Sequence, residues 1–195
     1  MVSQVLLGES VTRLAVDGKW ALVRCNWDSY EGWTEAIHFR SLDGAFEPSH
    51  GETCSIPNLD RHCHGIVTGD FAVVLDNSNQ EKLVLSAGCI LWKALFPEGI
   101  EILRGQLSNK RVGLYPSSSD YLMEMSLSWQ GTPYLWGGRS RFGVDCSGFM
   151  QILWQSVGIL LPRDAKDQFS AVTKIPVSER SQAFRKGNLA FFGTN

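Results

Sequence analysis

The stretch GVDCSGFM, residues 143–150, places a cysteine between an aspartate and a serine and leads directly into an apolar run. Apolar residues at helical spacing predict a helix over 146–157, which Gly158 can end. Cys146 then lies in the first helical turn, where unpaired N–H groups and the helix dipole favour a thiolate and can hold an oxyanion. This setting suits a cysteine nucleophile, although a small buried cysteine at the start of a core helix is the commoner interpretation of such a pattern alone.

The sequence around this stretch mixes helical and extended patterns. SSSDYLMEMSLSWQG upstream has the apolar spacing of a helix, and TPYLWGG after it is typical of a loop. Downstream, PRDAKDQFSAV predicts a short helix with Asp164 near its N-terminus, and GNLAFF (187–192) predicts a strand. Residues 113–195 are therefore expected to form one α+β unit.

The N-terminal half has the alternation of short β-strands. RLAVDGKWALVRC predicts a hairpin around Asp17-Gly18, and Trp20 and Trp33 are expected to pack the interior of a small barrel within residues 1–42. Residues 43–65 are rich in glycine and proline and are expected to be a linker. Residues 66–112 return to strand patterns and predict a second small β domain.

The composition excludes several kinds of function. With a net charge of −2 and no block of Lys and Arg, the chain lacks the basic patch that nucleic-acid binding requires. No apolar run approaches the roughly 20 residues of a membrane span, and MVSQVLLGES does not resemble a secretory signal peptide. Five irregularly spaced cysteines argue against a disulfide scaffold and favour a reducing compartment.

Four ordered motifs carry a family resemblance. GTPYLWGG (131–138), GVDCSGFM (143–150), PRDAKDQ (162–168) and GNLAFF (187–192) together resemble the NlpC/p60 family of bacterial cell-wall cysteine peptidases. The resemblance implies a papain-like α+β catalytic domain over 113–195. The upstream sequence is similar to a subgroup in which two SH3-like β-barrels, here 1–42 and 66–112, precede that domain.

That subgroup comprises γ-D-glutamyl-L-diamino acid endopeptidases. The resemblance implies hydrolysis of the γ-D-glutamyl–diamino acid bond in peptidoglycan stem peptides such as L-Ala-γ-D-Glu-diamino acid, usually with a free N-terminal L-alanine. It implies no metal and no organic cofactor. Recycling of such peptides in the bacterial cytoplasm fits the unpaired cysteines better than action in the periplasm.

The resemblance also assigns the catalytic centre. Cys146 is implied as the nucleophile that forms an acyl-enzyme. Asp145 and Ser147 are implied to flank it and bind the substrate backbone, and Tyr134 to line the site near the thiol.

The remaining implied site residues form the substrate pocket. Arg163 and Asp164 are expected there, with Asp164 as a candidate partner for the free amine of L-alanine through a charge-assisted hydrogen bond. Tyr30, from the first β domain, is expected to close the same pocket. Helix capping by Arg163 and Asp164 and plain barrel packing by Tyr30 are the simpler alternatives.

The chain departs from the family pattern at three points. Asn188 replaces the usual aspartate of the GDL motif, and Ala165 stands where relatives often carry serine, which can remove one substrate hydrogen bond. The family's catalytic histidine follows the GDLxFF strand, whereas the histidines here all lie upstream: His38, His50, His62 and His64. We therefore expect the chain to be a fragment, truncated at its C-terminus and also at its N-terminus, and inactive as it stands.

Two other functions compete with this interpretation. The first is a zinc site in the linker, because His and Cys are good zinc ligands, but their spacing fits no standard finger; the residues are His50, Cys54, His62, Cys63 and His64. The second is a non-catalytic cell-wall or muropeptide-binding protein with a degenerate peptidase domain. The missing histidine supports it, and the intact cysteine motif argues against it.

Overall fold

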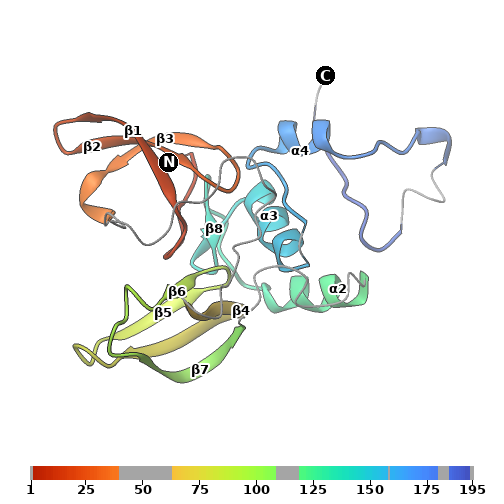
Figure 1. Ribbon diagram of the computed structural model, residues 1–195. Coiled ribbons are helices and arrows are strands. Elements are labelled where there is room, and N and C mark those ends of the chain that lie inside the picture. Colours follow the sequence, from red (N-terminus) through yellow and green to blue (C-terminus); the bar gives the residue numbers. More distant parts are fainter. Residues whose placement is uncertain (1, 40–62, 109–118, 158, 180–184, 194–195) are drawn as a thin grey trace.

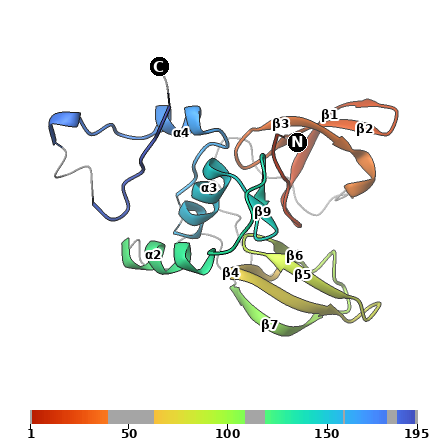
Figure 2. The same ribbon diagram turned by 180° about the vertical axis from the view of Figure 1, so that it is seen from behind.

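The computed structural model describes residues 2–39, 63–108, 119–157, 159–179 and 185–193. Two β-sheets lie on one side of the molecule and helices α2, α3 and α4 on the other, with the short β8–β9 hairpin between them (Figures 1 and 2). This mixed arrangement confirms the predicted α+β class. None of the described helices has the length and apolar character needed to cross a membrane.

The first sheet is antiparallel in the order β1 (Val11–Asp17), β2 (Trp20–Cys25), β3 (Glu31–Glu35) and is followed by the 3-10 helix η1 (Ala36–His38). The predicted hairpin is confirmed: Asp17 pairs with Trp20, and Gly18 adopts φ +56°, a conformation that favours glycine. These strands form an open sheet, so the expected closure into an SH3-like barrel is not confirmed for the described residues.

The tryptophans of this sheet do not pack its interior, contrary to expectation. Trp20 is 43% and Trp33 55% exposed, whereas Ala21 and Val23 are buried. Because successive side chains of a strand point to opposite faces, burial of Ala21 and Val23 turns Trp20 outward. Trp33 pairs with Leu22 and therefore shares the outward face.

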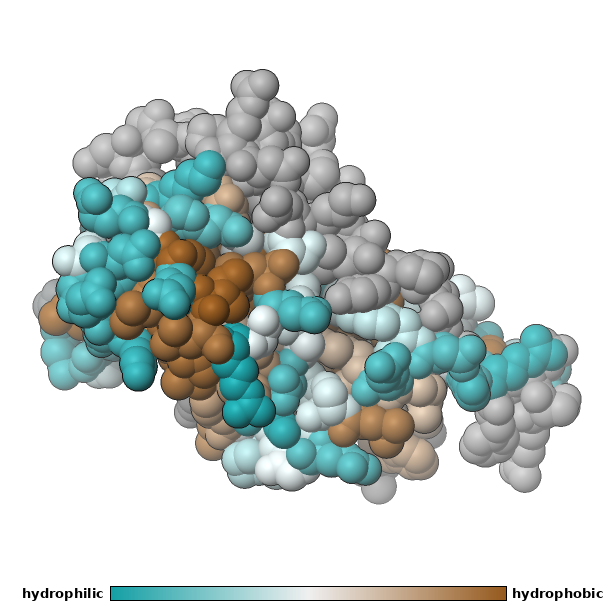
Figure 3. Space-filling model, turned by 90° about the horizontal axis from the view of Figure 1, so that it is seen from below, coloured by the Kyte–Doolittle hydropathy of each residue, from teal (hydrophilic) through white to brown (hydrophobic). Residues whose placement is uncertain are grey.

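The second sheet is built around one long strand, β4 (Cys63–Asp76), which pairs with β5 (Lys82–Ser86), β6 (Ile90–Trp92) and β7 (Ile100–Ser108). All these pairings are antiparallel, which confirms the strand patterns predicted after residue 65. Seen from below, the surface of the second sheet carries a hydrophobic area (Figure 3). Strand β5 exposes Val84 there, and strand β7 exposes Ile102 and Leu103.

The helical part contains α2 (Ser119–Ser128), α3 (Cys146–Ser156) and α4 (Ala165–Ala171), with β8 (Arg139–Ser140), β9 (Gly143–Val144) and the 3-10 helix η2 (Val177–Glu179). The three predicted helices are confirmed, and the proposed end of α3 at Gly158 lies outside the described residues. The strand predicted at 187–192 is wrong: the described part of the chain offers this segment no ladder partner.

One hydrophobic cluster joins the second sheet to α2 and α3. Val74 and Leu85 of the sheet pack in the same cluster as Met125 of α2 and Ile152 of α3, and Leu6 of the N-terminal segment joins them. The second sheet and the helices therefore share one core, although the sequence predicts a domain boundary between them at residue 113. The domain boundaries stay predictions, but the second sheet supports α3 directly.

Candidate active site

Cys146 is the first residue of α3, and its side chain is exposed. The other described cysteines, Cys25, Cys63 and Cys89, are buried. Burial, with the nearby Asp28 charge, raises the pKa of Cys25 to about 12, and burial raises that of Cys89 to about 11. These two thiols stay protonated at neutral pH, so Cys146 is the described cysteine whose surroundings suit nucleophilic chemistry.

Asp145 caps the N-terminus of α3 and organises the backbone on both sides of Cys146. Its Oδ1 accepts the Gly148 N–H at 2.7 Å, and its Oδ2 accepts the Gly137 N–H at 2.8 Å. Its own N–H donates to the carbonyl of Gly138 at 3.1 Å. One side chain thus fixes the first turn of α3 against the loop that contains Tyr134.

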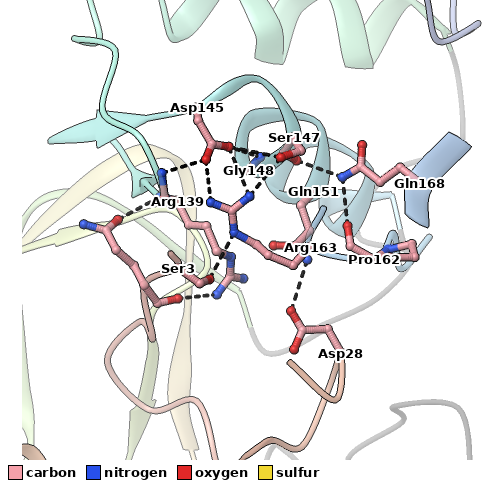
Figure 4. Close-up of polar contacts among 12 residues, drawn as sticks. Ser3, Asp28, Arg139, Asp145, Ser147, Gly148, Gln151, Pro162, Arg163 and Gln168 are labelled. Carbon is pink, nitrogen blue, oxygen red and sulfur yellow. Dashed lines mark hydrogen bonds and ion pairs between the residues drawn. The ribbon is translucent and has the colours of Figure 1, made fainter. Parts of the chain in front are cut away.

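Arg163 completes this arrangement from the segment before α4 (Figure 4). Its Nη2 donates to Asp145 Oδ2 at 2.6 Å, and its Nη1 donates to Asp145 Oδ1 at 3.1 Å and to Ser147 Oγ at 2.9 Å. Burial alone would raise the pKa of Asp145, but the bonds from Arg163, Gly148 and Gly137 outweigh it and lower that pKa below its ordinary value. Asp145 is therefore held as a carboxylate.

The close approach of two glycines allows this geometry. A Cβ at Gly148 would overlap the carbonyl oxygen of Gly138, and a Cβ at Gly138 would overlap that of Gly143. The turn 137–138 can therefore lie directly against the first turn of α3. The same contact places the loop at 131–138 beside Cys146, where Tyr134 forms an isolated bridge with Val144.

Tyr134 is 67% exposed and Trp136 lies exposed in the same loop, so neither ring packs into the core. Tyr30 is half-buried, and its hydroxyl lies near enough to Asp164 to sense the charge of that carboxylate, although the two residues belong to different halves of the chain. Burial, and then the Asp164 charge, raises the pKa of Tyr30, so its hydroxyl stays protonated at neutral pH. Asp164 is exposed and is the N-cap residue of α4, without a side-chain capping bond.

The structure thus brings the predicted residues together in two groups. Asp145, Ser147 and Arg163 are buried and bonded to one another, whereas the accessible group comprises Cys146, Tyr134, Asp164 and the half-buried Tyr30. Binding of substrate by the side chains of the first group stays a prediction. Their polar atoms already have partners inside the protein.

Sequence reasoning missed the residues that attach the N-terminal segment to this site. Arg139 donates to both Glu9 oxygens, at 2.9 and 3.0 Å, and to the Gln4 carbonyl at 2.8 Å, and its guanidinium lies 4.4 Å from the centroid of the Trp27 ring. Ser3 Oγ accepts from Arg163 Nε at 3.0 Å. The hydrogen-bonded members of these pairs are 130 or more positions apart, so no sequence signal could identify them.

The residues suggested as zinc ligands fall mostly outside the described chain, namely His50, Cys54 and His62. Of the others, Cys63 exchanges hydrogen bonds with Gly65, and His64 Nε2 contacts the carbonyl of Phe96 at 3.0 Å. Across residues 2–39, 63–108 and the described C-terminal ranges, no group of three His, Cys, Asp or Glu side chains is placed to hold a metal ion.

Comparison with known proteins agrees with the site and fold. Residues 131–195, which contain the cysteine motif and the loop before it, match the sequence model of the NlpC/P60 family. The fold is similar to that of an NlpC/P60 family protein from Bacillus cereus, with a TM-score of 0.73 at 24% identity over 95% of this chain and 63% of the other. The match to the family model covers the C-terminal third of the chain, and the structural similarity concerns the fold.

Homologues match over nearly the whole chain. A gamma-D-glutamyl-L-lysine dipeptidyl-peptidase from Bacillus subtilis strain 168 is 27% identical over 206 residues, covering 97% of this chain and 63% of the relative. A protein of the same name from Bacillus cereus is 28% identical, covering 97% of this chain and 59% of the relative. The chain therefore spans about three fifths of the length of these curated relatives.

Proposed function

We propose that this protein is a cysteine peptidase that hydrolyses the γ-D-glutamyl–diamino acid bond of peptidoglycan-derived peptides. The observation that carries the proposal is the exposed Cys146 at the start of a helix whose cap, Asp145, is held as a carboxylate by Arg163. The names of the two Bacillus homologues support this bond as the target.

The chemistry proceeds through an acyl-enzyme. The Cys146 thiolate attacks the γ-carbonyl carbon of D-glutamate, and the N–H groups of the first turn of α3 stabilise the oxyanion. The carbon–nitrogen bond then breaks as its nitrogen takes up the proton that the thiol gave to its base, and the diamino acid leaves as an amine. Water hydrolyses the thioester, which releases the γ-carboxylate and regenerates the thiol. The proton acceptor for the thiol is not among the residues that we assign.

We assign the free N-terminal amine of the substrate to Tyr30 and Asp164. The exposed Asp164 carboxylate offers a charge-assisted hydrogen bond to an ammonium group, and the nearby protonated Tyr30 hydroxyl offers a second polar group. Tyr134, in the loop beside Cys146, lines the site between amine and thiol. We also propose that both sheets are SH3-like domains. The first of them contributes Tyr30 to the substrate pocket.

Asp145, Ser147 and Arg163 are assigned to holding α3 and its neighbouring loop in place. Arg163 is almost fully buried, and the Asp145 oxygens accept from five internal donor atoms: the N–H groups of Gly137 and Gly148, two Arg163 nitrogens and the Ser147 hydroxyl. Contact with the substrate backbone in this region is assigned to main-chain groups of the first turn. Binding through these main-chain groups leaves the buried Arg163–Asp145 ion pair intact.

The deciding test is hydrolysis of L-Ala-γ-D-Glu-L-Lys, followed by mass spectrometry, with the full-length protein and its Cys146→Ala variant. We expect L-Ala-D-Glu and L-Lys from the wild type and no products from Cys146→Ala. Cys63→Ser is the matched control, because that thiol is buried away from the site. Turnover by Cys146→Ala at the wild-type rate would refute the assignment. Peptide binding without turnover by the wild type would favour the non-catalytic alternative.

A further inference from the structure

Gln151 lies on α3 behind the nucleophile and is completely buried. Its Nε2 donates two hydrogen bonds, to Asp28 Oδ2 at 3.2 Å and to the carbonyl oxygen of Leu161 at 3.1 Å. The first of these bonds crosses from the helical part to the first sheet (Figure 4). One amide nitrogen thus holds two segments that are far apart in the sequence.

The first segment leads to Tyr30. Asp28 Oδ1 accepts the backbone N–H of Tyr30 at 3.0 Å, so the carboxylate that Gln151 holds also fixes the Tyr30 main chain. Between them, Ser29 adopts φ +60°, a conformation that non-glycine residues rarely occupy. A turn in this conformation depends on the contacts that hold it, and Asp28 supplies two of them, to the Tyr30 N–H and to Gln151, beside the backbone bonds to Cys25.

The second segment leads to Asp164. The Leu161 carbonyl lies just before Pro162 and Arg163, and Asp164 follows directly. The Pro162 carbonyl is held in turn by Gln168 Nε2 at 2.8 Å, which also donates to the Ser147 carbonyl at 2.9 Å. The Tyr30 turn and the segment before α4, which we assign to the substrate site, are therefore both tied to the helix that begins with Cys146.

We propose that Gln151 is a positioning residue that sets the distance of the Tyr30–Asp164 pair from the Cys146 thiol, and so sets the preference for peptides with a free N-terminal amine. This inference rests on the proposed function. A primary amide is the side chain that the position requires, because two acceptors converge on it. Leucine would fill the space without donating, and glutamate would place a third acceptor beside them.

The first experiment compares kcat/KM for L-Ala-γ-D-Glu-L-Lys and its N-acetylated form, using full-length wild type, Gln151→Leu and Gln155→Leu. Gln155 is the matched control: it is also a buried glutamine of α3, and it makes no described contact with Asp28 or Leu161. We expect Gln151→Leu to reduce the preference for the free amine by about tenfold, the effect of one hydrogen bond to a charged group. Gln155→Leu should leave the preference unchanged within about twofold, whatever it does to stability.

Asp28→Asn tests the same link without removing volume. The single amide oxygen of asparagine can accept from Gln151 Nε2 or from the Tyr30 N–H but not from both, so its Nδ2 meets a donor at the other position. We expect the preference for the free amine to fall as it does in Gln151→Leu. An unchanged preference in both variants would overturn the inference.

Amide hydrogen exchange of Tyr30 provides a readout that needs no substrate. We expect faster exchange in Gln151→Leu than in wild type and Gln155→Leu, with amides of β4 and β7 unchanged. If the wild type hydrolyses neither peptide, the proposed function fails, and the exchange result alone decides whether Gln151 positions the turn. Equal Tyr30 exchange in all three proteins would refute the positioning role.

Discussion

Two buried arginine–carboxylate pairs, Arg163–Asp145 and Arg139–Glu9, differ in what they join. Arg163 and Asp145 are 18 positions apart, and their bond fixes the residue beside Cys146. Arg139 and Glu9 are 130 positions apart, and their bond joins the N-terminal segment to β8. Each arginine side chain is only 1% exposed. The Arg163–Asp145 pair therefore stabilises the site around Cys146, whereas the similar Arg139–Glu9 pair joins segments that are far apart in the sequence.

Their surroundings differ in the same way. Asp145 also caps α3, so its pair with Arg163 cannot change without moving the first helical turn. Glu9 accepts the Leu6 N–H at 2.8 Å, and Arg139 of β8 stacks on Trp27, so this pair is surrounded by the N-terminal segment and the connection after β2. The comparison shows that burial alone does not say what an ion pair does. The groups bonded to each pair show which segment it holds: the first turn of α3 in one case and the N-terminal segment in the other.

The largest effect is expected from Arg163→Met, which leaves the Asp145 carboxylate buried without its partner. Removal of one member of a buried pair costs about 3–5 kcal/mol. We expect a matching decrease in the free energy of unfolding, measured by urea denaturation, together with slower alkylation of Cys146 by iodoacetamide under native conditions. Unchanged alkylation in a folded variant would show that the pair does not support the first turn of α3.

Arg139→Met should cost a similar free energy of unfolding, about 3–5 kcal/mol, but act on assembly rather than on the thiol. We expect the alkylation rate of Cys146 to stay within about twofold of wild type while the thermal unfolding midpoint falls. The double variant Glu9→Gln/Arg139→Met should regain part of the loss, because it leaves no unpaired buried charge. A large alkylation change here would remove the distinction between the pairs.

A smaller effect is expected from pH. The folded-state pKa of Asp145 is lowered, so its contribution to stability is present above the ordinary aspartate pKa of about 3.9 and is lost as pH falls through the folded-state value. Urea unfolding between pH 7 and pH 3 should therefore show a weaker acid-side loss of stability in Asp145→Asn than in wild type. Parallel curves for the two proteins would contradict the assignment.

The smallest effect is expected from the exposed pair Lys186–Asp120, which has a short separation of 2.7 Å but lies in solvent. Exposed ion pairs contribute little and are screened by salt. We expect Lys186→Ala to leave the thermal unfolding midpoint unchanged at physiological salt. A clear decrease would show that the segment around Lys186 is held more firmly than its exposure indicates.

The sequence predicted the elements whose signals are local. The hairpin at Asp17-Gly18 and the helix beginning at Cys146 follow from turn chemistry and apolar spacing, and both are present. The outward orientation of Trp20 was not predictable, because alternation defines two faces without saying which one is buried. The strand expected at 187–192 depends on a neighbouring strand, which its own residues do not encode.

The same limit applied to the site. Motif resemblance singled out Cys146, Asp145 and Arg163, and the structure places Asp145 and Arg163 in direct contact. The motif resemblance could not show that Arg163 is buried, nor that Gln151 and Arg139 hold distant segments in place. Those roles arise from three-dimensional neighbours, which one sequence without its homologues does not reveal.

The N-terminal segment has a consequence for the kinetics of folding. Its Leu7 carbonyl accepts from Ile90 N–H and its Gly8 carbonyl from the Trp92 indole, while Gln4 meets Arg139 and Ser3 meets Arg163. This segment is synthesised before its partners, so it completes its contacts only after residue 163 has left the ribosome. Contacts of such long sequence separation form slowly, so this segment is expected to dock late, after the second sheet and α3 have joined.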